Sequence, residues 1–226
     1  PLPTVGGDII GVRNPLVERA NATDYAVPVG ELGPVFVVVP TALPAGLVKS
    51  FQIFNQTTPG SSPTGSAGSV FHAYVLRPTG TNQYTVVYDS GLLTVPTPTN
   101  PAGEVATFPV PDIAVQAGDV LGFYGQGIPV DVDTGSDVMA YPAPVPPTLS
   151  QAITLGEGDF PIYPQARAYS FGAQVLDMSG QNTVIVGGIR KFVDALPGLG
   201  PTGANNLGQY IPVAQADTTT YPGSDY

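Results

Sequence analysis

Apolar and polar residues follow one another along the chain in short runs that favour β-strands, and helical periodicity is almost absent. Residues 34–39 form a continuous apolar, mostly β-branched run, which is typical of a strand buried on both faces. Residues 69–77 place apolar side chains on both faces of a second predicted strand. Further strands are expected at residues 47–54, 82–88, 91–95, 104–110, 119–125, 137–141, 166–176 and 182–189.

Glycine and proline separate these predicted strands, because the 226 residues include 28 Gly and 26 Pro. Short strands at this spacing predict an all-β fold, an antiparallel β-sandwich or jelly roll with extended terminal arms. We expect an N-terminal arm over residues 1–24, a sandwich domain over 25–188 and a C-terminal arm over 189–226. The proline-rich residues 141–147 favour polyproline II geometry and are expected to cross the edge of the sandwich as a stiff connector.

Composition excludes several kinds of chemistry. The chain has one His and no Cys, which excludes thiolate metal sites, a cysteine nucleophile and any multi-histidine site within one chain. Seven basic residues against seventeen acidic ones, with a net charge of -10, argue against a nucleic-acid-binding surface. No apolar run is long enough to cross a membrane, so we expect no membrane insertion. Low charge with much Thr, Asn, Gly and Pro is typical of secreted β-proteins, so the sequence predicts an extracellular location.

The strongest local group of acidic residues is Asp131-Val-Asp-Thr-Gly-Ser-Asp137. The carboxylates of Asp131, Asp133 and Asp137 around a glycine bend can converge on a hard cation, as in acidic calcium loops. The alternative is a solvated hairpin turn in which Asp and Gly supply the turn geometry.

No enzymatic mechanism is indicated by the spacing of ionisable residues, and we expect no catalytic activity and no resident cofactor besides calcium. His72 lies within a predicted strand and is interpreted as a structural histidine. Aromatic side chains offer a stacking platform for sugars or an anchor for a protein interface, although core positions are the commoner role. The tyrosines considered for such a platform are Tyr124, Tyr141, Tyr163 and Tyr169. Asn21-Ala-Thr23 and Asn55-Gln-Thr57 match the N-glycosylation triplet.

The C-terminal residues include many apolar side chains in an otherwise Gly- and Pro-rich segment, and a flexible linker would carry fewer of them. We expect these side chains to pack either on their own domain or on a neighbouring subunit. The predicted assembly residues are Phe192, Leu196, Leu199, Leu207, Tyr210 and Ile211.

The same segment, from Ile189-Arg-Lys-Phe-Val-Asp-Ala-Leu-Pro-Gly-Leu-Gly200 to Thr218-Thr-Thr-Tyr-Pro-Gly-Ser-Asp-Tyr226, resembles the lead-in of bacterial secreted multicopper oxidases. In that family such a segment precedes the first cupredoxin domain, and copper is held by His-x-His pairs and a His-Cys-His segment. Because this chain has one His and no Cys, the resemblance implies a noncatalytic N-terminal module.

Three functions are therefore open. The first is a secreted structural module that forms a homo-oligomer or polymer, such as a filament or matrix, through its terminal arms. The second is a carbohydrate-binding or adhesive module for a polysaccharide, supported by calcium. The third is the accessory domain of a secreted multicopper oxidase.

Overall fold

The computed structural model describes residues 8–20, 35–56, 66, 68–179, 182–186 and 189–193. The chain divides into two compact units, residues 9–177 and residues 1–8 together with 178–226. Every regular element in the described residues is a β-strand, which confirms the all-β prediction.

The strands of the larger unit are β1 (Asp8–Arg13), β2 (Val35–Val39), β3 (Gly46–Asn55), β4 (Val70–Gly80), β5 (Gln83–Thr94), β6 (Glu104–Val115), β7 (Val120–Gly125), β8 (Val130–Ala140), β9 (Ala152–Thr154), β10 (Arg167–Tyr169) and β11 (Phe171–Asp177). The smaller unit contains β12 (Asn182–Val186) and β13 (Ile189–Val193), which pair with each other as an antiparallel hairpin.

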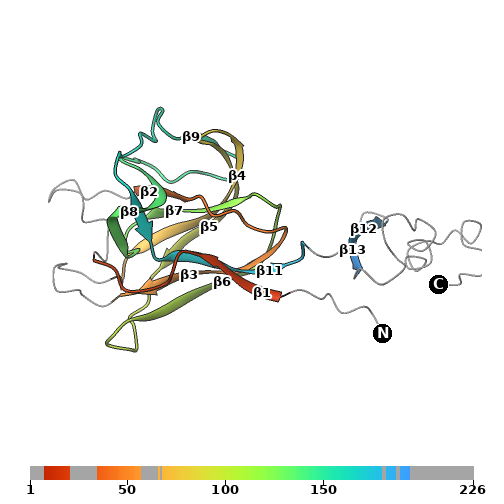
Figure 1. Ribbon diagram of the computed structural model, residues 1–226, viewed down its shortest axis with the longest axis horizontal. Coiled ribbons are helices and arrows are strands. Elements are labelled where there is room, and N and C mark those ends of the chain that lie inside the picture. Colours follow the sequence, from red (N-terminus) through yellow and green to blue (C-terminus); the bar gives the residue numbers. More distant parts are fainter. Residues whose placement is uncertain are drawn as a thin grey trace, which may run out of the picture. The chain divides into compact units, whose positions relative to one another are not determined.

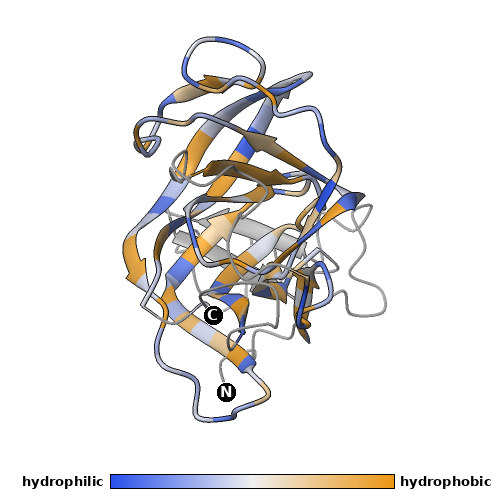
Figure 2. Ribbon diagram, turned by 90° about the vertical axis from the view of Figure 1, so that its left-hand side faces the viewer, coloured by the Kyte–Doolittle hydropathy of each residue, from blue (hydrophilic) through white to orange (hydrophobic). Residues whose placement is uncertain are grey.

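The larger unit is an antiparallel β-sandwich, as predicted (Figure 1). One sheet has four strands in the order β1-β11-β3-β6, and the other has seven in the order β10-β8-β2-β7-β4-β5-β9. Strand β6 lies at an edge, which is where the backbones of Pro109 and Pro111, lacking an N–H group, can be accommodated. Figure 2 shows bands of apolar residues along the strands, interrupted by polar ones.

Strand β2 explains why residues 34–39 form an unbroken apolar run. All five residues of β2 are at most 1% exposed, because the seven-stranded sheet is covered on both faces. Val35, Val37 and Val39 belong to the core between the two sheets. Phe36 and Val38 belong to a second apolar cluster on the outer face of the seven-stranded sheet. The prediction of a strand buried on both faces is thus confirmed.

The outer cluster is covered by residues 141–151 and 155–166, on either side of the edge strand β9, rather than by a third sheet. Ala143, Ile153 and Phe160 pack on it, and the Tyr74 hydroxyl donates to the Pro147 carbonyl at 3.1 Å. The proline-rich connector therefore contributes to a cover over the face of the seven-stranded sheet, in addition to linking strands, because that face is apolar and needs burial.

The predicted strand over residues 166–176 is two strands that belong to different sheets. Strand β10 pairs with β8 in the seven-stranded sheet, and β11 pairs with β3 in the four-stranded sheet. Ser170 lies between them, fully buried, and its N–H donates to the Pro129 carbonyl at 2.9 Å. Alternation of apolar side chains continues through this crossing, so the sequence pattern carries no sign of the change of sheet.

Other boundaries also differ from expectation. The predicted strands 82–88 and 91–95 form the single strand β5, which passes through Gly91 in the left-handed region with φ 67°. Strand β8 begins at Val130, well before the predicted start at residue 137. The strands β1, β9 and β13 were not expected, because residues 1–24 and 189–226 were predicted as extended arms and the three residues of β9 give too little periodicity to recognise.

The terminal segments are only partly described. Strand β1 lies in the stretch expected as an N-terminal arm over residues 1–24, and it is hydrogen-bonded to β11 in the four-stranded sheet. Within the expected C-terminal arm, residues 189–193 form β13, paired from Ile189 opposite Val186 to Val193 opposite Asn182.

Candidate functional site

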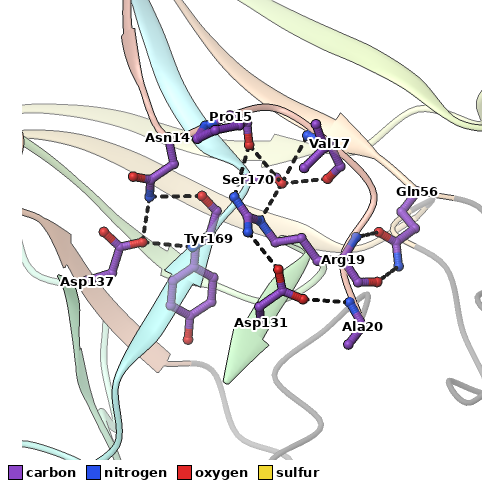
Figure 3. Close-up of polar contacts among 10 residues, drawn as sticks. All are labelled: Asn14, Pro15, Val17, Arg19, Ala20, Gln56, Asp131, Asp137, Tyr169 and Ser170. Atoms are coloured by element: carbon purple, nitrogen blue, oxygen red, sulfur yellow. Dashed lines mark hydrogen bonds and ion pairs between the residues drawn. The ribbon is translucent and has the colours of Figure 1, made fainter. Parts of the chain in front are cut away.

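Residues 14–20 follow β1 and form what we call the N-terminal strap (Figure 3). Pro15 has no N–H group to continue the ladder of β1, and the strap is held mainly by side chains of the sandwich. Its contacts come from β8, from Gln56 directly after β3, and from Tyr169 and Ser170 at the crossing between the sheets.

Arg19 is the anchor of the strap, with a side chain that is only 7% exposed. Its Nε donates to the Ser170 hydroxyl at 2.7 Å, and its Nη1 donates to Asp131 Oδ2 at 2.8 Å. Its Nη2 donates to the carbonyl of Pro15 within the strap at 3.0 Å. The guanidinium therefore has a partner at each nitrogen, which is what burial of this charge requires.

The backbone of the strap is recognised by side chains that act as strand partners. The Gln56 amide accepts from the Arg19 N–H at 2.7 Å and donates to the Arg19 carbonyl at 2.8 Å. Asp131 Oδ1 accepts from the Ala20 N–H at 2.9 Å, and the Ser170 hydroxyl donates to the Val17 carbonyl at 2.6 Å. All of these bonds are made to main-chain atoms of the strap. Asp131 and Ser170 in addition bind the Arg19 side chain.

Asn14 begins the strap and contacts a second carboxylate. Its Nδ2 donates to Asp137 Oδ2 at 2.7 Å and to the Tyr169 carbonyl at 3.1 Å. The same oxygen of Asp137 accepts from the Tyr169 N–H at 2.7 Å, whereas Oδ1 is buried without a hydrogen-bond partner in the described residues. Burial raises the pKa of Asp137 to about 6, against the opposing effects of the Tyr169 and Asn14 hydrogen bonds and of the Arg19 charge.

The predicted calcium ligands are held in three different settings on β8. Asp131 is paired with Arg19, Asp133 accepts from the Gln165 amide at 2.9 Å, and Asp137 is 4% exposed. No group of three or more His, Cys, Asp or Glu side chains in the described residues is placed to hold a metal ion. Calcium binding stays a prediction, and the hairpin-turn alternative is wrong, because residues 131–137 all lie within strand β8.

His72 has a structural partner, in line with its expected role. Its Nδ1 lies 2.9 Å from Asp89 Oδ1, and its ring stacks on Tyr74 with 6.0 Å between centroids. His72 also lines a groove of about 340 Å³ on the outer face of the seven-stranded sheet.

The tyrosines considered as a sugar platform are mostly turned inward. Tyr169 is 1% exposed and Tyr124 is 7% exposed, so neither presents an open ring face, although Tyr124 lines the groove beside His72. The Tyr163 ring is covered by the Arg167 guanidinium at 5.0 Å, and Tyr141 is half-buried against the core between the sheets.

Asn55 is fully buried and its amide nitrogen donates to the Pro96 carbonyl at 2.7 Å, so the folded chain does not offer it for glycosylation. Asn21 lies outside the described residues. Of the predicted assembly residues, Phe192 lies on β13 opposite Thr183. Outside the described residues are Leu196, Leu199, Leu207, Tyr210 and Ile211.

Sequence reasoning missed the centre of the strap site. Arg19, Gln56 and Ser170 are far apart in the chain and belong to no motif, so no local signal in the sequence identifies them.

Comparisons with protein-family models, with curated proteins and with solved structures found no match to this chain. Among the described residues, no helix has the length and apolar character needed to span a membrane.

Proposed function

We propose that this chain is a noncatalytic, secreted structural module that self-associates by exchanging its N-terminal segment between copies. Strand β1 and the strap of one copy would occupy, on a second copy, the positions that they occupy on their own sandwich. Repeated without closing a ring, such an exchange produces a filament.

The observation that carries the proposal is the way the strap is bound. Arg19 enters the body of the sandwich and is bound by Asp131 and Ser170, while Gln56 pairs with its backbone. None of these partners adjoins the strap in sequence, so the binding site does not depend on which copy provides the strap. Residues 21–34 separate the strap from β2 and supply the connection that would cross between copies.

Main-chain pairing supports the same proposal. Strand β1 is an edge strand of the four-stranded sheet, hydrogen-bonded to β11. Addition of an edge strand from another molecule uses backbone hydrogen bonds for affinity and side chains for register. Here Arg19 and Asn14 provide that register, because each reaches carboxylates of β8.

A charge exchange between two full-length variants tests the proposal. Arg19→Asp places a carboxylate beside Asp131, and Asp131→Arg places two guanidinium groups together, so each variant alone should lose assembly. In an equimolar mixture, the strap of each variant matches the site of the other. We therefore expect the mixture to recover the oligomers seen for the unaltered chain by light scattering and electron microscopy.

The chain carrying both substitutions is the matched control, because it restores opposite charges within every copy and should assemble by itself. Circular dichroism confirms that each variant is folded. An unaltered chain that stays monomeric at every concentration, or a mixture that behaves as the sum of its two components, would contradict strap exchange.

Calcium support through Asp131, Asp133 and Asp137 is tested separately. If a calorimetric titration with millimolar Ca²⁺ gives no heat and the melting temperature is unchanged, these residues do not bind calcium.

A further inference from the structure

The groove on the outer face of the seven-stranded sheet lies where its cover ends. It has a volume of about 340 Å³ and is formed by β4, β5, β7 and the covering segment at Pro146. Val70 and Leu92 line it and are 43% and 65% exposed, which is unusual for large apolar side chains on a sheet whose neighbouring residues are buried.

Two polar groups that have no hydrogen-bond partner among the described residues also line this groove, Nε2 of His72 and the side-chain amide of Gln126. Asp89 Oδ1 lies 2.9 Å from His72 Nδ1 and also accepts from the Gly91 N–H at 2.8 Å, so a neutral His72 donates through Nδ1 and presents Nε2 as an acceptor. No described residue bonds to Nε2 of His72 or to the side-chain amide of Gln126, which also lines the groove. The amide both donates and accepts.

The lining excludes several classes of ligand. An anion would meet no Lys or Arg among the lining residues, and the Asp89 carboxylate stands directly behind His72. A cation would find no carboxylate among them. A purely apolar ligand would cover His72 Nε2 and the Gln126 amide without replacing their hydrogen bonds to water. At so small a site, the free-energy cost of those lost hydrogen bonds exceeds the free energy gained from apolar contact.

We propose that this groove binds one ring of a neutral carbohydrate. The C–H face of a sugar ring packs on Val70, Leu92 and Pro146, over a floor that includes Tyr124. One hydroxyl donates to His72 Nε2, and a neighbouring hydroxyl pairs with the Gln126 amide. The groove volume lies at the lower end of the range for small-ligand sites, which suits a single ring of a longer glycan better than a bulky aglycone.

The test uses the full chain and calorimetric titration with four neutral oligosaccharides: cellohexaose, laminarihexaose, xylohexaose and mannohexaose. We expect at least one to bind. Gln126→Ala should weaken that binding about threefold to tenfold, the effect of one neutral hydrogen bond. Leu92→Ala should weaken it as well. Gln83→Ala, which removes an exposed amide at the β4–β5 turn outside the groove, should leave the affinity unchanged.

A second titration separates a glycan site from a docking site for an apolar protein segment. Its probe is an uncharged peptide with the sequence of residues 195–214. Peptide binding that is weakened by Leu92→Ala but not by Gln126→Ala would overturn the carbohydrate proposal. So would the absence of binding to all four oligosaccharides, or glycan binding that Gln126→Ala leaves intact. The proposal does not rest on strap exchange, since none of the residues that line the groove is among those that hydrogen-bond to the strap in the described residues.

Discussion

Replacing Asp137 by Asn should change how the stability of the sandwich depends on pH. The pKa of Asp137 is raised from 3.8 to about 6 in the folded chain, chiefly because burial disfavours the carboxylate. Between these two values the folded chain binds a proton that the unfolded chain has released. The free energy of unfolding therefore falls as pH rises through this window, and it is higher below the unfolded value than above the folded one.

The size of this effect follows from the two pKa values. Their difference corresponds to about 3 kcal/mol of stability lost between about pH 4 and pH 7. An Asn side chain can still accept from Tyr169 and Asn14, but it does not titrate, so this loss should disappear in the variant. Its amide NH₂ meets no acceptor at the position of Oδ1 in the described residues. That cost is the same at every pH and displaces the whole curve without altering its slope.

Urea unfolding followed by tyrosine fluorescence or circular dichroism, repeated across this pH range, measures the effect. The informative quantity is the difference in unfolding free energy between the variant and the unaltered chain, which should move by about 3 kcal/mol in favour of the variant as pH rises. Asp112→Asn removes an exposed carboxylate paired with Lys49 and controls for the loss of one negative charge. A difference that stays constant from acid to neutral pH would refute the argument.

Three further substitutions test the packing argument by equilibrium unfolding at neutral pH. Ser170→Ala removes the hydroxyl that Arg19 and the strap backbone share, and should cost about 1–3 kcal/mol. Asp119→Ala removes a 1% exposed carboxylate that accepts from Arg77 Nε and Nη2, each at 2.9 Å, and should cost about 2 kcal/mol, less than a fully buried pair because Arg77 is partly exposed. Gly135→Ala should cost about 1–3 kcal/mol, because φ is 83° and an added Cβ would lie 2.4 Å from the Arg167 carbonyl oxygen. An unfolding midpoint within error of the unaltered chain would contradict the corresponding prediction.

Strand positions could be predicted wherever burial alone decides the residue type. The run at β2 is recognisable because both faces are covered and every position must be apolar. The change of sheet at Ser170 could not be predicted, because β10 and β11 keep the same apolar character on either side of it. What marks the crossing is a buried hydroxyl whose partners lie in other elements, and that is tertiary information.

The candidate site, too, could be predicted from the sequence only in part. Asp131 and Asp137 stand out in the sequence as acidic residues close together, and metal binding is the natural interpretation of such spacing. Their partners, Arg19 and Asn14, come from the N-terminal part of the chain, 112 and 123 residues away. Local spacing cannot reveal that Asp131 pairs with Arg19 or that Asp137 accepts from Asn14, because both partners are distant in sequence. Calcium binding by these carboxylates stays a prediction.

Two of the few charged side chains in this chain form ion pairs that hold segments outside the apolar core. Arg19 holds the strap, and Arg77 holds Asp119 in the turn between β6 and β7. In a sandwich with so few ionisable side chains, each such pair fixes a segment that the apolar core does not itself position.

The groove at His72 differs, because Nε2 of His72 and the amide of Gln126 line it without a hydrogen-bond partner among the described residues. The strap site draws on β8 and on the crossing of β10 and β11, whereas the groove draws on β4, β5 and β7. Because the two sites share no residue, Gln126→Ala should leave the charge-exchange assay unaffected, and Arg19→Asp combined with Asp131→Arg should leave glycan affinity unaffected. Coupling between the two assays would mean that assembly builds or blocks the groove, and would make the glycan site a property of the polymer rather than of the single sandwich.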